Sequence, residues 1–123
     1  MKNVSTPNAP AAIGPYSQAI ISNGMVYTSG QIAIDPATGT INGTTIEEQT
    51  EQVCKNIQAL LEAAGTSMEK VVKTVCFLAD MNDFAAFNAV YAKYFVSNPA
   101  RSCVAVKTLP KNVLVEIDTV AER

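Results

Sequence analysis

The chain has 123 residues, enough for one domain over residues 1–123, and 48% of them are hydrophobic, which excludes a disordered protein. The formal net charge of −2 argues against a nucleic-acid partner, because phosphates favour a basic surface. The sequence has no histidine, which excludes a Ser-His or Cys-His dyad and a histidine-ligated metal.

No apolar stretch reaches the ~20 residues of a membrane helix, and no signal-peptide core follows Met1. Cys54, Cys76 and Cys103 are odd in number, widely spaced and embedded in apolar runs. They are typical of reduced thiols and not of a disulfide framework. We therefore expect a cytoplasmic protein without membrane association.

The N-terminal third predicts an irregular arm followed by strands. Residues 1–15 contain three prolines and a glycine, which favour irregular structure. Residues 16–21 and 25–29 predict two strands joined by a tight turn at Asn23-Gly24. Residues 32–34 are expected to extend the second strand before a turn over 35–39.

The middle of the chain predicts a helix, a strand and a second helix. Thr45 and Glu48 form a capping-box signature, an apolar residue recurs at helical spacing after them, and Gly65 ends the helix. Residues 71–78 predict a strand from their β-branched content. Asp80 is expected to cap a second helix with an aromatic stripe: Phe84, Phe87, Tyr91, Tyr94 and Phe95.

The C-terminal third predicts two strands of a hairpin, with a turn at residues 109–112 and Glu116 opposite about Val104. The order β-β-α-β-α-β-β predicts an α+β sandwich with a mostly antiparallel mixed sheet and two helices on one face. Period-two alternation divides the last strand between two faces. The face away from the helices would carry Leu114, Glu116, Asp118 and Val120, which favours self-association.

Arg101 and Glu116 are the residues most suited to chemistry. A guanidinium holds a small carboxylate with two hydrogen bonds, and a desolvated carboxylate moves a proton near neutral pH. The hairpin would place the two side chains ~10 Å apart along the strand, with room for a small organic acid. The plain alternatives are a strand-end arginine in water and a solvent-facing glutamate.

Other residues are weaker candidates. Tyr16 could present its hydroxyl to a cleft or pack ordinarily, and Ser29-Gly30 ends a strand where a ligand could approach the backbone. Asn88 could be a surface amide or a buried hydrogen-bonding group. Cys103 is better read as a small core residue than as a nucleophile, because nothing nearby would generate its thiolate.

These motifs resemble those of the RidA/YjgF family nearly end to end. The resemblance rests on Ala11-Ala12-Ile13-Gly14-Pro15-Tyr16-Ser17-Gln18-Ala19, Thr28-Ser29-Gly30-Gln31-Ile32, Glu62-Ala63-Ala64-Gly65, Asn82-Asp83-Phe84, and Pro99-Ala100-Arg101-Ser102-Cys103-Val104 with Val115-Glu116-Ile117. One departure is Asn98, which precedes Pro99 where many members carry an aromatic residue.

The resemblance implies a fold like chorismate mutase of bacilli and a homotrimer with a closed inner barrel and clefts between subunits. It implies cofactor-free hydrolysis of 2-iminopropanoate and 2-iminobutanoate to 2-oxo acids and ammonia. Arg101 matches the residue that grips the substrate carboxylate, and Glu116 the one that handles water and the leaving amine. The cleft would be lined by Tyr16, Ser29, Gly30, Asn88 and Cys103.

Two other functions compete with an imine deaminase. A non-catalytic protein that senses 2-oxo acids or similar carboxylates would use the same arginine. An endoribonuclease or translation inhibitor, an activity of some relatives, is less expected because the chain is acidic and has no histidine.

Overall fold

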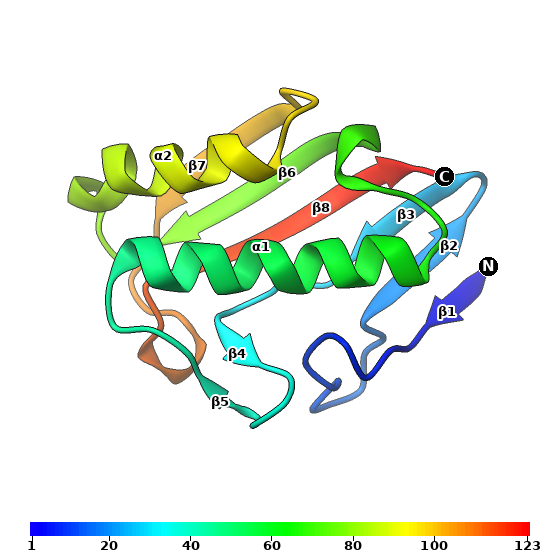
Figure 1. Cartoon of the computed structure of the whole chain (residues 1–123), viewed down its shortest axis with the longest axis horizontal. Helices are drawn as coiled ribbons and strands as arrows, with labels where there is room; N and C mark the ends of the chain where they lie inside the picture. Colours follow the sequence, from blue (N-terminus) through cyan, green and yellow to red (C-terminus); the bar gives the residue numbers. More distant parts are fainter.

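The computed structural model describes residues 1–123 and contains a six-stranded sheet with two α-helices against one face (Figure 1). The sheet comprises β1 (Lys2–Val4), β2 (Ala19–Ser22), β3 (Met25–Thr28), β6 (Val71–Leu78), β7 (Ala100–Ala105) and β8 (Val115–Glu122). The helices are α1 (Ile46–Ala63) and α2 (Phe84–Tyr94), and 3₁₀ turns lie at Met68–Lys70, Met81–Asp83 and Pro110–Asn112. The predicted α+β fold is confirmed.

The strand order is β1-β2-β3-β8-β6-β7, and only β6 and β7 are parallel neighbours. The predicted hairpin between the last two strands is therefore wrong, because β6 lies between β7 and β8. A parallel pair needs a crossover, and α2 supplies it between β6 and β7. The segment 106–114 then carries the chain past β6 to the centre of the sheet.

The N-terminal strands were predicted in part. Asn23 and Gly24 have positive φ in the β2–β3 turn, as a tight hairpin requires. The arm contains an edge strand, β1, that the prolines gave no reason to expect. Residues 32–34 do not extend β3, because the chain turns away and forms a separate hairpin of β4 (Ile34–Asp35) and β5 (Thr40–Ile41).

The structure confirms the predicted start and end of the first helix. Thr45 and Glu48 form the capping box of α1, and Gly65 follows its C-cap with φ +82°. The strand predicted at 71–78 is β6. Asp80 caps the 3₁₀ turn that leads into α2 and not α2 itself. Of the aromatic stripe, Phe87, Tyr91 and Phe95 are buried between α2 and the sheet, and Phe84 and Tyr94 are half-buried.

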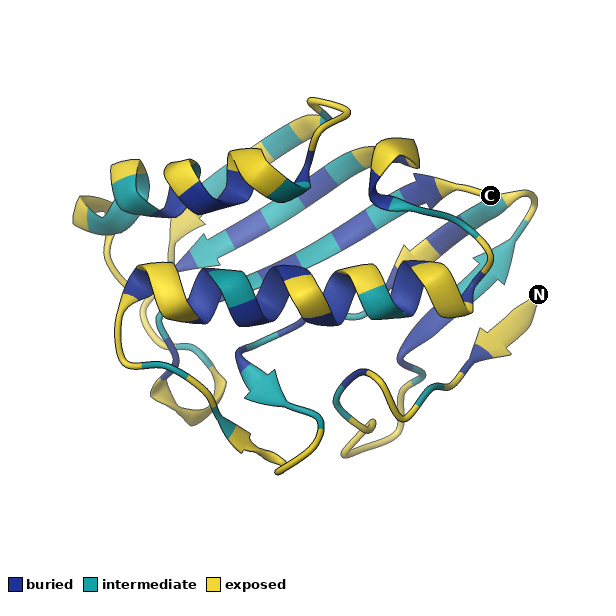
Figure 2. Cartoon of the chain, viewed as in Figure 1, coloured by how far each residue is buried: buried dark blue, intermediate teal, exposed yellow.

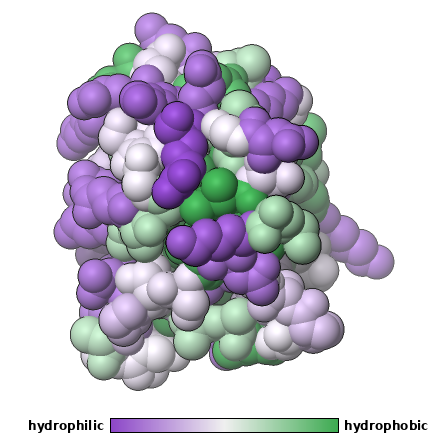
Figure 3. Space-filling view, turned by 90° about the vertical axis from the view of Figure 1, so that its right-hand side faces the viewer, coloured by the Kyte–Doolittle hydropathy of each residue, from purple (hydrophilic) through white to green (hydrophobic).

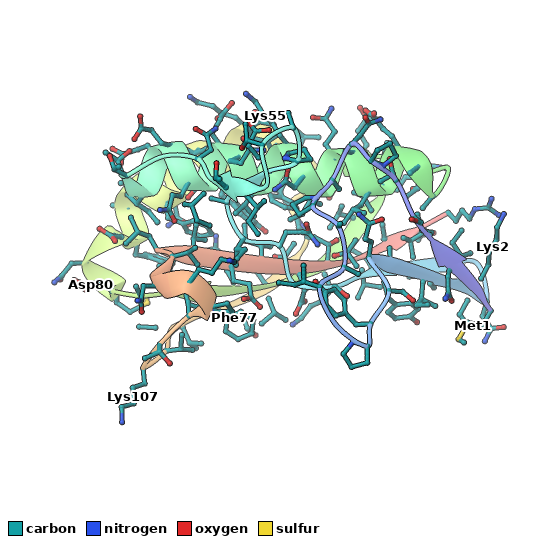
Figure 4. All side chains as sticks on the ribbon, turned by 90° about the horizontal axis from the view of Figure 1, so that it is seen from below. Met1, Lys2, Lys55, Phe77, Asp80 and Lys107 are labelled. Carbon is teal, nitrogen blue, oxygen red and sulfur yellow. The ribbon has the colours of Figure 1, made fainter.

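The two faces of the sheet differ in burial. Along β8, buried residues alternate with half-buried ones, and the same stripes cross β6 (Figure 2). Both helices lie on one side, and Phe77 projects from the other side (Figure 4). We call this other side the open face. It comprises Ile20, Met25, Tyr27, Lys73, Val75, Phe77, Val104, Glu116, Asp118 and Val120. Leu114 differs from the prediction, since it packs against the core.

The side of the molecule that bears β1 and the end of α1 is mostly hydrophilic around a small hydrophobic area (Figure 3). None of the helices combines the length and apolar composition that crossing a bilayer requires.

Candidate functional site

A pocket of ≈ 240 Å³ lies where the N-terminal arm, the segment after β3 and the start of β8 meet. Seen from below, the arm before β2 reaches to the open side of the sheet (Figure 4). The pocket therefore forms from chain segments far apart in sequence. Its lining includes Pro10, Ile13, Tyr16, Gly30, Ile32 and Glu116. Three of the predicted site residues, Tyr16, Gly30 and Glu116, meet here.

Gly30 is required by the position of Glu116. A Cβ atom at residue 30 would lie 2.9 Å from Glu116 Cδ and closer still to one carboxylate oxygen. Side-chain atoms essentially never approach so closely, so any larger residue would displace the carboxylate. The absence of a Cβ atom at Gly30 leaves room for the side chain of Glu116, and Gly30 also lines the pocket.

The surroundings of Glu116 favour its protonated form. Burial raises the pKa of this carboxyl above its ordinary value, and the negative charge of Asp118 raises it further. Asp118 lies two residues along β8 on the same open face, and burial raises its pKa also. A carboxyl in this condition can exchange a proton closer to neutral pH than a free one.

Tyr16 and Ser29 are held by backbone groups. The Tyr16 hydroxyl accepts a hydrogen bond from the Ile13 N–H at 3.2 Å and keeps its own proton available for donation. The Ser29 hydroxyl donates to the Ser17 carbonyl at 2.6 Å and is not part of the pocket lining. Ser29 therefore fixes the end of β3 beside Gly30.

Arg101 lies elsewhere, on the edge strand β7 and on the face covered by α2. It is in register with the fully buried Thr74, so both side chains belong to the helix side. Its guanidinium carbon lies 4.8 Å from the ring centre of Tyr91, 5.4 Å from Phe84 and 5.9 Å from Phe87. These rings recur at helical spacing along α2 and form a platform under the cation.

Asn88 supplies the polar contact of Arg101. Its Oδ1 atom accepts a hydrogen bond from Arg101 Nη1 at 2.8 Å. Because this acceptor is neutral, the cation is oriented without being neutralised. The remaining N–H donors of the half-buried guanidinium can hold a carboxylate by two parallel hydrogen bonds.

Cys103 lies two residues after Arg101 on the same face and packs against the core. Burial raises the pKa of its thiol, and the lowering by Arg101 does not offset this. Cys76, its register partner on β6, has a pKa raised to about 12 by burial. These thiols lack the thiolate character of a nucleophile.

The predicted placement of one acid between Arg101 and Glu116 of the same chain is wrong. Glu116, Phe77 and Val104 form one rung across β8, β6 and β7, so two strand spacings, ~10 Å, separate the two strands. The side chains also point to opposite faces of the sheet. Each chain therefore contains two separate half-sites, a carboxylate pocket at Glu116 and a guanidinium platform at Arg101.

Two pocket residues were missed by sequence reasoning. Gln18 and Gln31 are buried and line the pocket. The signal available was weak, because Gln18 lay within the strand predicted at 16–21 and Gln31 just after the strand predicted at 25–29. No group of three or more His, Cys, Asp or Glu side chains that could hold a metal ion occurs in the structure.

The family described as "Endoribonuclease L-PSP" (Ribonuc_L-PSP) matches residues 6–123. The chain is 47% identical to the 2-iminobutanoate/2-iminopropanoate deaminase of Salmonella typhimurium, over 99% of this chain and 98% of that protein. It is 54% identical to "Putative regulator AldR" of Lactococcus lactis, over 99% and 98%. TdcF of E. coli, solved with bound serine, superposes with a TM-score of 0.95 at 42% identity, over 100% of this chain and 99% of that chain. The chain therefore belongs to this family, the RidA/YjgF family.

Proposed function

We propose that this protein hydrolyses reactive 2-imino acids, such as 2-iminopropanoate and 2-iminobutanoate, to 2-oxo acids and ammonia in the cytoplasm. The observation that carries the proposal is the pair of half-sites. Glu116 has the raised pKa of a proton carrier, and Arg101 has free donors on an aromatic platform. A 2-imino acid presents one group for each, an electrophilic C=N carbon and a carboxylate.

The chemistry needs one carboxylate and one anchor. Glu116 takes a proton from water as the water oxygen bonds to C2 of the protonated imine. It returns the proton to nitrogen in the resulting carbinolamine and accepts the hydroxyl proton as the C–N bond breaks. The departing ammonia takes up that proton and leaves as ammonium, which restores the Glu116 carboxylate. Arg101 fixes the carboxylate, and this orients C2 toward the water. Tyr16 would donate its hydroxyl proton to a polar atom of the substrate.

The two half-sites would meet between subunits of a homotrimer. Arg101 lies on an edge strand, where a neighbouring chain can approach, and the open face carries half-buried apolar residues such as Phe77 and Val120. Closing three such sheets into an inner barrel would cover this face and bring Arg101, Asn88 and Cys103 of one chain to Tyr16, Gly30 and Glu116 of the next. Light scattering should then give close to three times 13.1 kDa.

A non-catalytic sensor of 2-oxo acids is the second candidate, favoured by the 54% identity to a relative named as a regulator. It would use Arg101 in the same way but would not require Glu116 to exchange protons. The name of the family leaves an endoribonuclease as a third possibility, which the acidic net charge of −2 disfavours.

One assay separates these functions. A pyridoxal-phosphate-dependent dehydratase generates 2-iminopropanoate from serine, and semicarbazide traps the imine that has not been hydrolysed. If the protein is a deaminase, the amount of imine trapped by semicarbazide is expected to fall, and pyruvate is expected to be released faster. Binding of 2-oxobutanoate without a fall in the amount of trapped imine would indicate the sensor. Cleavage of RNA by the wild-type protein but not by Glu116→Gln would indicate the nuclease.

A further inference from the structure

The arm that walls the Glu116 pocket, residues 5–16, has little internal support. Its only backbone–backbone hydrogen bond joins the Tyr16 N–H to the Gly14 carbonyl at 2.8 Å. Ala9, 2% exposed, is its one fully buried side chain. The position of the arm must therefore depend on a contact from outside it.

Gln18 supplies that contact with a single side-chain amide. Its Oε1 accepts from the Thr6 N–H at 2.7 Å. Its Nε2 donates to the carbonyls of Thr6 at 3.0 Å, Ala9 at 3.3 Å and Pro10 at 2.8 Å. Gln18 is only 5% exposed, so water cannot readily replace these bonds. The amide binds the arm at both ends of the segment 6–10.

The arm has open space on both sides at this point. Gln18, Tyr16 and Ala11 line the Glu116 pocket and also a second cavity of ≈ 590 Å³. Apart from the buried Ala9, little side-chain packing therefore holds this part of the arm in place, and the amide of Gln18 is its main hydrogen-bonded support. Beyond Pro10 the chain continues directly to Ile13 and Tyr16, which form the pocket wall facing Glu116.

We propose that Gln18 is a positioning residue that fixes the arm against the pocket and thereby sets the affinity for small 2-imino and 2-oxo acids over longer ones. The proposal rests on the proposed function, since it takes the Glu116 pocket as the place where the acid binds. The amide of Gln18 is already engaged by the arm backbone and takes no part in the proton transfer. Its loss should weaken binding and leave the proton transfer by Glu116 nearly unchanged.

Two variants test this assignment. Gln18→Met keeps the length of the side chain and removes every bond, and Gln18→Glu keeps the acceptor for the Thr6 N–H but loses the donors. Gln58→Met, on the exposed surface of α1, is the matched control. Hydrogen exchange, calorimetry with 2-oxobutanoate and 2-oxo-4-methylpentanoate, and steady-state kinetics are measured on the full-length protein.

We expect exchange of the hydrogen-bonded arm amides, those of Thr6, Asn8 and Ile13, to accelerate at least ~10-fold in Gln18→Met and less in Gln18→Glu, while exchange in α1 and β6 stays as in the control. Affinity for 2-oxobutanoate and KM for its imine should worsen ~10-fold, with kcat within ~3-fold, and the preference for the smaller acid should shrink. Faster arm exchange with unchanged affinity would overturn the proposal. So would a uniform rise in exchange across the whole protein, which would make Gln18 a general folding residue.

Failure of the role of Gln18 and failure of the proposed function give different results. A wild-type protein that neither binds 2-oxobutanoate nor hydrolyses the imine contradicts the proposed function itself. A wild-type protein that does both, with Gln18 variants that match it in affinity and selectivity, contradicts only the role of Gln18.

Discussion

Glu116 and Arg101 lie fifteen residues apart in sequence but in contrasting environments on opposite faces of the sheet. Glu116 sits above a glycine in a small pocket, where burial and Asp118 favour its protonated form. Arg101 rests on three aromatic rings and a neutral amide, with no partner that cancels its charge. The environment of Glu116 suits a proton carrier, and that of Arg101 suits an anchor for an anion. Neither half-site alone offers both groups that the proposed hydrolysis of a 2-imino acid needs.

The largest effect is expected from Glu116→Gln, which keeps the size of the side chain but cannot exchange protons. We expect kcat to fall ~10²- to 10⁴-fold while affinity for 2-oxobutanoate stays within ~3-fold. Glu122→Gln, exposed at the end of β8, is the control. A parallel loss of rate and affinity would show that Glu116 only binds.

The same variant has a defined stability behaviour. The folded protein raises the pKa of Glu116, so this group contributes most to stability below its unfolded pKa, and the contribution declines as pH rises through the folded pKa. At neutral pH, Glu116→Gln should therefore be at least as stable as the wild type in chemical denaturation. This separates loss of activity from loss of folding.

The next effect is expected from Arg101→Ala. Loss of a charge-assisted bidentate anchor should cost ~2–5 kcal/mol of transition-state binding, ~30-fold or more in kcat/KM. Arg101→Lys should recover little, because an ammonium lacks the planar fork. Lys107→Ala, at an exposed position, serves as control. Near-normal kcat/KM in Arg101→Ala would show that the guanidinium platform is not part of the substrate site.

A smaller loss is expected from Gly30→Ala, which leaves both chemical groups in place. The added methyl would displace the Glu116 carboxylate, and a displacement of about 1 Å should reduce kcat ~10- to 100-fold. Gly14→Ala is the matched control, since its Cβ would meet Tyr16 at an ordinary 3.5 Å. Equal activity of the two alanine variants would mean that the position of Glu116 is not critical.

The smallest effect is a displacement of the pH profile in Asp118→Asn. In the proposed reaction Glu116 acts as a base in the first step, so activity should fall as pH drops through its pKa. Removing the negative charge of Asp118 lowers that pKa, and the acidic limb of kcat should move to lower pH. Asp83→Asn, on the other face, should leave the limb in place. An unchanged limb in Asp118→Asn would show that burial alone sets the pKa.

The sequence predicted the local elements of the fold better than their pairing. Thr45 with Glu48, Gly65 and Asn23-Gly24 act on neighbouring residues, so their effects could be read directly. The position of β6 between β7 and β8 depends on which strands pair over a long range, and a proline-containing turn could not reveal that. The error also changed the candidate site, because a hairpin would have put Arg101 and Glu116 on adjacent strands.

The residue types of the candidate site stand out in the sequence, whereas their structural environment could not be predicted from it. Arginine in Pro99-Ala100-Arg101 and glutamate in an apolar strand stand out in the sequence. The aromatic stripe of α2 was recognised, but its role as a platform for Arg101 follows only from the crossover that stacks α2 on β7. The role of Gln18 depends on the path of the arm, for which the sequence offers no periodic pattern.

The central claim, that each site takes Glu116 from one chain and Arg101 from the next, can be tested by mixing two inactive variants. Glu116→Gln and Arg101→Ala chains are co-expressed with different tags, and assemblies that contain both are purified and assayed for imine hydrolysis. A cyclic trimer that contains both kinds of chain has one site of three that combines an intact Glu116 with an intact Arg101, so the purified mixed assemblies should show about one third of the wild-type activity. Activity that stays at the level of the separate variants, in assemblies confirmed to be mixed, would contradict a site shared between chains.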